Sequence, residues 1–151
     1  MTFGDIVRRF RYANRLTVVE LTGEEVRKYL EYAYGLRYNT MRRSTDDLLR
    51  MTRDRDGRLR TRTAVYNLDE AGGIFYEVDV SKPPCRRIRI SALSDGTPVD
   101  LRKRYRVVLN SHRIEAGYLT RACGLSGEEI KSRTVETVEK DLRLRMREGF
   151  S

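Results

Sequence analysis

The chain of 151 residues is long enough for one domain with its own hydrophobic core. Hydrophobic residues make up 39% and charged residues 35%, and no apolar run approaches the roughly 18 residues of a membrane span, which argues against a membrane segment. The net charge of +9 would suit a polyanionic partner, but Asp interrupts arginine clusters such as RDRDGRLRTR, so nucleic-acid binding is unlikely.

The first third of the chain predicts a helix, a strand and a second helix. A short helix is expected over 3–10, and the β-branched run RLTVVEL predicts a strand over 15–21. Thr22 and Glu25 form a capping box that begins a helix over 23–34. One apolar face of that helix, expected to belong to the core, carries Val26, Tyr29, Leu30 and Ala33.

The middle of the chain combines a polar excursion with two strands. Residues 36–65 are arginine-rich and weakly periodic, with STDDLL able to open a short helix at Ser44, and long ordered excursions are often functional. GIFYEVDV and RRIRISAL predict strands over 73–80 and 86–92. The short SKPP connection makes these two strands an antiparallel pair.

The last third predicts one more strand and two helices. A turn in SDGTPV, built on its Asp-Gly pair, precedes a strand over 105–109. Ser126 begins a second capping box before a short helix, and a last helix is expected over 138–148. The predicted fold is an α+β domain over 1–151, in which the four strands form one mixed β-sheet flanked by helices.

Residues able to carry catalysis are few. His112 is the only histidine, and the sequence contains no HExxH, GxxxxGK[ST] or GxSxG motif. Cys85 and Cys123 could pair or remain buried thiols, and neither lies in a CxxC motif. The residues therefore indicate a binding domain, and no catalytic or metal-ligating residue is assigned.

Several segments, in their order along the chain, resemble the C-terminal domain of 5′-nucleotidases. Asn14 to Val26 follow the pattern N-x-L-x-V-x-x-L-T-G-x-x-[IV], and AGGIFYEVDVSKP looks like the glycine joint and strand of that family. Gly96 to Asn110 follow G-x-P-[LIV]-D-x-x-x-x-Y-x-V-x-x-N. YNTM, YNxD and NSxR also occur in one bacterial branch of the family, and together these segments cover most of the chain.

This resemblance implies a two-domain phosphoesterase that hydrolyses nucleoside 5′-monophosphates or 2′,3′-cyclic nucleotides. Family members hold two divalent metals in an N-terminal metallophosphatase domain, whose motifs GNHE and GHxH this chain lacks. The chain thus resembles the nucleotide-binding domain alone, with no cofactor of its own and the metallophosphatase domain as its partner. The family also implies a periplasmic or cell-surface location, although no signal peptide is visible.

In the family two aromatic rings sandwich the nucleotide base. The matching residues here are Tyr66, before the glycine joint, and Tyr118, in the loop after the last predicted strand. Stacking on each ring is worth about 1–3 kcal/mol, while the hydroxyl stays in water. Gly72 and Gly73 let the backbone approach the base closely or adopt positive φ. The polar residues expected nearby are Asn67, Asp69 and Asn110.

The loop after Asn110 departs from the family pattern. Relatives carry a glycine-rich sequence such as NGGDGF, whereas RIEAGY here is shorter and includes Ile114 and Glu115. Glu115 would repel a phosphate unless it faces away. Two alternatives stay open: Tyr66 is a core residue beside a simple bulge, or the chain is a small basic nucleic-acid-binding or structural domain.

Overall fold

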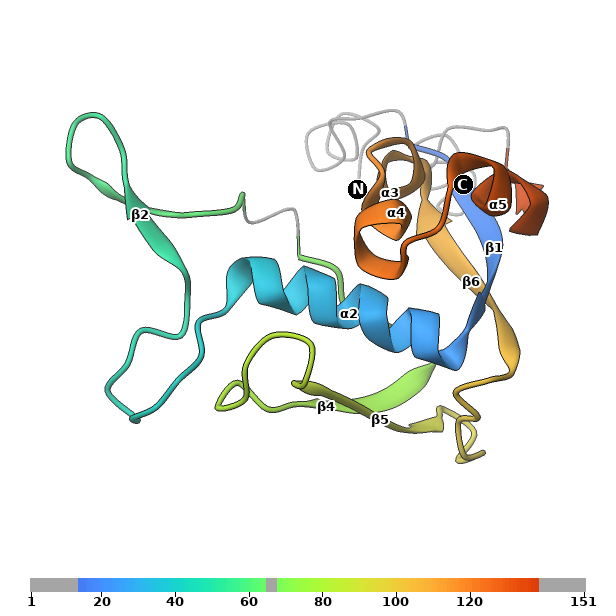
Figure 1. Cartoon of the computed structure of the whole chain (residues 1–151), viewed down its shortest axis with the longest axis horizontal. Coiled ribbons are helices and arrows are strands. Elements are labelled where there is room, and N and C mark those ends of the chain that lie inside the picture. The colour runs from blue at the N-terminus through green and yellow to red at the C-terminus, as the bar shows by residue number, and fades with distance from the viewer. Residues whose placement is uncertain (1–13, 65–67, 139–151) are drawn as a thin grey trace, which may run out of the picture. The chain divides into compact units, whose positions relative to one another are not determined.

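Helices and strands both occur in the described part of this computed structural model, residues 14–64 and 68–138 (Figure 1). The strands are β1 (Leu16–Thr22), β2 (Met51–Arg53), β3 (Leu59–Thr61), β4 (Ile74–Val78), β5 (Ile88–Leu93), β6 (Arg104–Asn110) and β7 (Thr134–Thr137). The helices are α2 (Gly23–Arg37), α3 (Ser111–Glu115), α4 (Tyr118–Cys123) and α5 (Gly127–Arg133). The predicted α+β class is confirmed.

The described chain forms two compact units. The terminal unit contains residues 14–21 and 104–138, and the central unit contains residues 22–64 and 68–103. Each unit has its own strands and helices.

A three-stranded sheet in the order β6-β1-β7 organises the terminal unit. Side chains alternate along β1, and Thr17, Val19 and Leu21 are the buried ones. β7 pairs antiparallel with β1 and places Thr137 opposite Thr17. The alternation predicted for a half-buried strand is thus realised, because one face of β1 lies against the interior.

A complete capping box starts α2 in the central unit. The Thr22 hydroxyl accepts a hydrogen bond from the Glu25 backbone N–H at 3.2 Å, and the Glu25 carboxylate accepts one from the Thr22 N–H at 2.7 Å. The second predicted box is also present, between Ser126 and Glu129 at the start of α5. Each box satisfies two donors that a helix N-terminus would otherwise leave unpaired.

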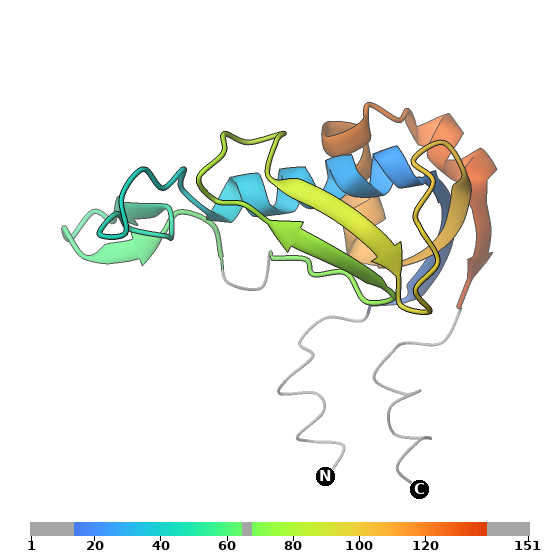
Figure 2. The same ribbon diagram turned by 90° about the horizontal axis from the view of Figure 1, so that it is seen from below.

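The core of the central unit lies between α2 and the β4–β5 hairpin, which runs alongside the helix in Figure 2. Leu30, Tyr34 and Ile88 are its buried residues. Tyr29 on the same helix is only 5% exposed, which confirms its predicted place in the core. β4 and β5 are antiparallel, also as predicted, with Tyr76 opposite Ile90.

A buried arginine ties the loop after α2 to the hairpin. The Arg87 guanidinium donates hydrogen bonds to the carbonyl oxygens of Lys82 and Tyr38 and to the Thr40 hydroxyl, at 2.8 to 2.9 Å. Arg87 is 2% exposed, and burial lowers the pKa of its guanidinium. These bonds compensate the desolvation of a charged group that is otherwise costly to bury.

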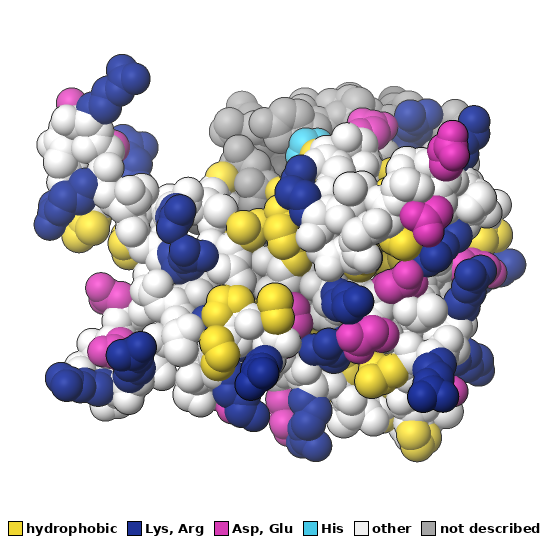
Figure 3. All heavy atoms as spheres, in the orientation of Figure 1, with side chains coloured by type: hydrophobic (Ala, Val, Ile, Leu, Met, Phe, Trp, Pro, Cys, Tyr) yellow, Lys and Arg dark blue, Asp and Glu magenta, His cyan; other side chains and the backbone are white. Residues whose placement is uncertain are grey.

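A second hairpin, β2–β3, follows the loop after α2 and extends away from that helix (Figure 1). Figure 3 shows several Lys and Arg side chains in dark blue on this hairpin. Leu59 on β3 is 61% exposed. In its turn the Asp54 carboxylate accepts a hydrogen bond from the Arg60 side chain at 2.6 Å. The helix predicted at Ser44 is wrong, since Ser44 lies in a turn.

The grouping of the predicted strands into one mixed sheet is wrong. β1 and β6 share a sheet with β7, whereas β4 and β5 form a separate two-stranded sheet. Periodicity marks a strand but does not identify its hydrogen-bonding neighbour, and the unpredicted β7 takes one side of β1.

Three further expectations concern the ends of the chain, the two thiols and a membrane span. The helices predicted over 3–10 and 138–148 lie outside the described residues, apart from Val138. Cys85 and Cys123 are free thiols. Within the described residues, no helix has the length and apolar character needed to cross a membrane.

Candidate functional site

Two of the seven predicted site residues, Tyr66 and Asn67, lie outside the described residues. The segment that follows them, residues 68–73, is held by hydroxyl groups from the central core. The Tyr29 hydroxyl donates a hydrogen bond to the Asp69 carboxylate at 2.9 Å. The Ala71 backbone N–H donates to the Tyr76 hydroxyl at 3.3 Å. This segment therefore has fixed anchor points immediately after Tyr66.

Those anchors belong to a cluster of tyrosines. The hydroxyl oxygens of Tyr34 and Tyr76 lie 3.1 Å apart, and the two rings meet edge to face with centroids 6.2 Å apart. Burial, together with the hydrogen bond to Tyr76, raises the pKa of Tyr34 well above its ordinary value. The Tyr34 hydroxyl consequently stays protonated at neutral pH and acts as a neutral hydrogen-bonding group in this cluster.

The glycine joint has the backbone freedom that the sequence predicts. Gly73 has a φ of +86°, a conformation that other residues rarely adopt, and its carbonyl accepts a hydrogen bond from the Ser94 N–H at 2.9 Å. Among the described residues, apart from the adjacent ones in the chain, none has an atom within 4 Å of the position that a Cβ would take at Gly72 or Gly73. The backbone at both glycines thus borders open space.

Asn110 and Tyr118 belong to the terminal unit. The Asn110 side chain caps α3 by accepting a hydrogen bond from the His112 backbone N–H at 2.8 Å. Tyr118 begins α4 and is 7% exposed. The guanidinium carbons of Arg113 and Arg121 lie 4.7 and 5.1 Å from the centre of its ring. Tyr118 already has cation–π partners in this structure.

The proposed facing of Tyr66 and Tyr118 stays a prediction, because Tyr66 lies outside the described residues. A base that stacks on Tyr118 has to share or displace a guanidinium group. Glu115, which the sequence suggested would repel a phosphate, has a carboxylate oxygen 3.9 Å from the Arg15 guanidinium.

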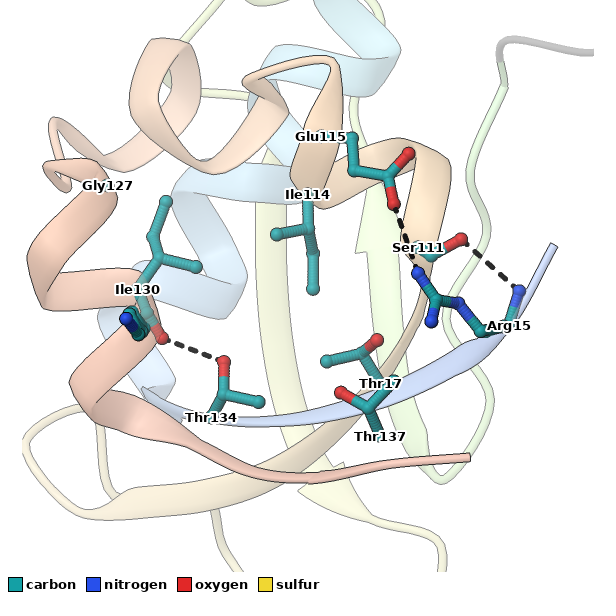
Figure 4. Close-up of a pocket in the computed structure, with 10 residues that line it drawn as sticks. Arg15, Thr17, Ser111, Ile114, Glu115, Gly127, Ile130, Thr134 and Thr137 are labelled. Atoms are coloured by element: carbon teal, nitrogen blue, oxygen red, sulfur yellow. Dashed lines mark hydrogen bonds and ion pairs between the residues drawn. The ribbon is translucent and has the colours of Figure 1, made fainter. Parts of the chain in front are cut away.

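A cavity of about 270 Å³ that the sequence did not predict lies in the terminal unit, bordered by β1, α3, α5 and β7. Figure 4 shows the Ile114 and Ile130 side chains on two sides of it, with the cross-strand pair of Thr17 and Thr137 beneath. These residues come from separate parts of the chain, and no local motif joins them. We call this space the β1–α5 cavity.

No cluster suited to a metal ion is found among the described residues: none of their His, Cys, Asp and Glu side chains gather in groups of three or more. Residues 68–73 carry the Asp69 and Glu70 carboxylates. The β1–α5 cavity is lined by threonine and serine hydroxyls together with three charged side chains, and such groups suit hydrogen bonding to an organic ligand.

The fold resembles part of a larger solved structure. A solved structure from Staphylococcus aureus, described as a 5′-nucleotidase in complex with alpha-ketoglutarate, superposes with a TM-score of 0.65 at 15% identity. The superposition covers 97% of this chain and 26% of that one. At this identity the likeness concerns the fold alone.

Sequence comparison gives the family. The family described as 5′-nucleotidase, C-terminal domain, matches residues 1–122. A Salmonella typhimurium protein named 2′,3′-cyclic-nucleotide 2′-phosphodiesterase/3′-nucleotidase is 30% identical over 128 residues, which cover 78% of this chain and 19% of that protein. Its Haemophilus influenzae namesake is 29% identical over 124 residues, covering 75% of this chain and 18% of that protein.

A third relative is the trifunctional nucleotide phosphoesterase protein YfkN of Bacillus subtilis, 29% identical over 143 residues, which cover 83% of this chain and 9% of that protein. The chain belongs to the 5′-nucleotidase C-terminal domain family. It spans less than a fifth of the length of each of these three relatives.

Proposed function

We propose that this chain is the substrate-binding domain of a two-domain, metal-dependent phosphoesterase acting on nucleoside monophosphates or 2′,3′-cyclic nucleotides. The family match carries the proposal, since the relatives are named for nucleotide phosphodiester and phosphomonoester hydrolysis. The two divalent metals and the chemistry of hydrolysis belong to a metallophosphatase domain that acts together with this one.

The nucleoside would bind at residues 66–73. Tyr66 offers a flat ring on which any base can stack, and its neighbour Asn67 offers an amide for the ribose or the base edge. The hydrogen bonds that anchor Asp69 and Ala71 support this role, because an ordered backbone beside the ligand loses less conformational entropy on binding. The open space at Gly72 and Gly73 leaves room for the ligand against the backbone.

Calorimetric titration of the chain with adenosine and AMP tests the proposal. We expect a dissociation constant on the order of 1 mM, since one stacking ring supplies only a few kcal/mol. Tyr66→Ala should abolish the heat of binding. Phe75→Ala is the matched control, because Phe75 is an aromatic residue on the adjoining strand that is 58% exposed.

Two outcomes count against the proposal. The absence of binding by the unaltered chain at several times the expected dissociation constant would refute nucleoside recognition. Binding that falls steeply with salt would instead indicate a polyanion site, since phosphate contacts weaken with salt and stacking changes little.

The chain by itself should show no hydrolysis of AMP or 2′,3′-cyclic AMP with added manganese or zinc, and turnover lost in His112→Ala would contradict the division of roles.

A further inference from the structure

The β1–α5 cavity is built differently from the predicted nucleoside site. None of the five described residues assigned to nucleoside binding lines it. Its lining contains hydroxyl groups, two isoleucines and a small number of charged side chains. An apolar cavity with a few convergent polar groups is the usual form of a small-molecule site.

Buried hydroxyls form the polar part of the lining. Thr17 is 6% exposed and Ser111 is 7% exposed, so both side chains are more than nine-tenths buried. The Ser111 hydroxyl accepts a hydrogen bond from the Arg15 backbone N–H at 3.2 Å. The Thr17 side chain borders the cavity (Figure 4), so its hydroxyl can hydrogen-bond to a ligand or a water molecule there.

Two cations and one carboxylate border the cavity. Lys131 and Arg15 are positively charged, and Glu115 is the only acidic residue in the lining. The charges of Arg15 and Glu115, which lie 3.9 Å apart, offset one another, so the net charge of these three side chains equals that of Lys131. The surplus positive charge favours a negatively charged ligand.

The volume limits the size of the ligand. At roughly 30 Å³ for each water molecule, 270 Å³ equals about nine waters. That is below the ~300–1,000 Å³ range of pockets for drug-sized molecules, so a whole nucleotide is too large. A molecule of about ten non-hydrogen atoms matches the space.

We propose that the β1–α5 cavity binds a small organic oxyanion, a carboxylate or phosphate monoester on a short aliphatic stem. The oxyanion accepts hydrogen bonds from the Lys131 ammonium and the Thr17 hydroxyl, and the stem packs between Ile114 and Ile130. This site goes beyond the proposed nucleoside recognition and does not depend on it.

Titration of the full chain, followed by the NMR methyl signals of Ile114 and Ile130, tests the proposal. The probes are glycerol 3-phosphate, succinate, inorganic phosphate and uncharged glycerol. Glycerol 3-phosphate or succinate should shift both methyl signals, with a dissociation constant on the order of 1 mM. Inorganic phosphate should bind about tenfold more weakly because it has no stem, and glycerol should cause no shift. The better of the two organic probes distinguishes a phosphate ester from a carboxylate.

Charge-matched variants identify the contacts. Lys131→Gln removes an exposed charge and should weaken binding roughly five- to tenfold, the effect of losing one charge-assisted hydrogen bond. Arg106→Gln removes the same charge from an exposed position on β6, outside the lining, and should change binding less than about twofold. Thr17→Val keeps the side-chain shape, and loss of its hydroxyl should also weaken binding.

The proposal is overturned if neither organic anion shifts the two isoleucine signals at tens of times the expected dissociation constant. It is equally overturned if Lys131→Gln and Arg106→Gln weaken binding to the same extent, since only the general positive charge then matters. If inorganic phosphate binds as tightly as glycerol 3-phosphate, the two isoleucines do not contribute to binding and this part of the proposal is refuted.

Discussion

The same four-residue helix start occurs twice, as Thr22-Gly-Glu-Glu and as Ser126-Gly-Glu-Glu, and it gives a matched pair of mutations. The glycine is the first helical residue in both, but its surroundings differ. A Cβ at Gly23 would lie 2.8 Å from the Asp100 carbonyl oxygen and 3.0 Å from the Leu101 Cα. A Cβ at Gly127 would meet no atom within 4 Å.

Gly23→Ala should therefore destabilise the protein. The neighbouring loop is held by hydrogen bonds from the N–H of Gly23 to the Lys103 carbonyl at 3.1 Å and from the N–H of Glu24 to the Leu101 carbonyl at 2.9 Å. The added methyl group has to displace backbone atoms, which costs about 1–3 kcal/mol, against a gain in helix propensity of at most about 1 kcal/mol. Gly127→Ala should show only the gain in helix propensity, because its methyl group meets no steric conflict among the described residues.

Chemical and thermal unfolding followed by circular dichroism measures both changes. For a chain of about 150 residues, each kcal/mol corresponds to roughly 2–4 °C in Tm. Gly23→Ala should lower Tm by several degrees, and Gly127→Ala should leave it unchanged or slightly higher. Equal effects of the two substitutions would refute the close approach of the 100–103 loop to the start of α2.

Two further predictions concern side-chain interactions of α2. Tyr29→Phe keeps the buried ring but removes the hydrogen bond to Asp69, which should lower the free energy of unfolding by about 1–3 kcal/mol. Amide exchange at residues 68–73 should become faster. Unchanged exchange there would show that this hydrogen bond does not hold the segment. The hydrogen bond from Arg27 lowers the pKa of Glu24, so its stabilisation is present above the ordinary pKa of 4.5 and lost as pH falls through the lower folded value. The stability difference between the native chain and Glu24→Gln should accordingly disappear on acidification, and a difference that persists at pH 2 would contradict this assignment.

Much of the local structure could be predicted because local chemistry specifies it. Both capping boxes, at Thr22 and Ser126, begin helices as expected, since the side chains that satisfy the first N–H groups lie within four residues of sequence. β1, β4, β5 and β6 also occur where the sequence predicted strands, β1 from its β-branched apolar run and β4 from its alternation. The pairing of β4 with β5 was predicted from their short connection. The partners of β1 and β6 could not be predicted, because their pairing depends on contacts between distant residues.

The elements that were missed are short and polar. β2 and β3 have three residues each and carry mostly exposed side chains, so they show no alternation between a buried and an exposed face. β7, at Thr134–Thr137, contains three β-branched residues, which was an available signal. The excursion was expected to be long and ordered, but its hairpin could not be read from periodicity.

The candidate site was predictable only where residues are close in sequence. The glycine joint was expected to adopt positive φ, and Gly73 does so. The anchoring of the segment by Tyr29 and Tyr76 was not expected, because a tyrosine on an apolar helix face or strand gives no sign of where its hydroxyl points. The β1–α5 cavity depends on four elements meeting, which no local pattern encodes.

The two predicted aromatic residues are not equivalent partners for a base. Tyr118 is buried and its ring lies near two guanidinium groups, so a base stacking there replaces an existing cation–π contact and the net gain is small. Tyr66 directly precedes a segment fixed by tyrosine hydroxyls and bordered by open glycine backbone. Most of the nucleoside binding free energy in the proposed site should therefore come from Tyr66.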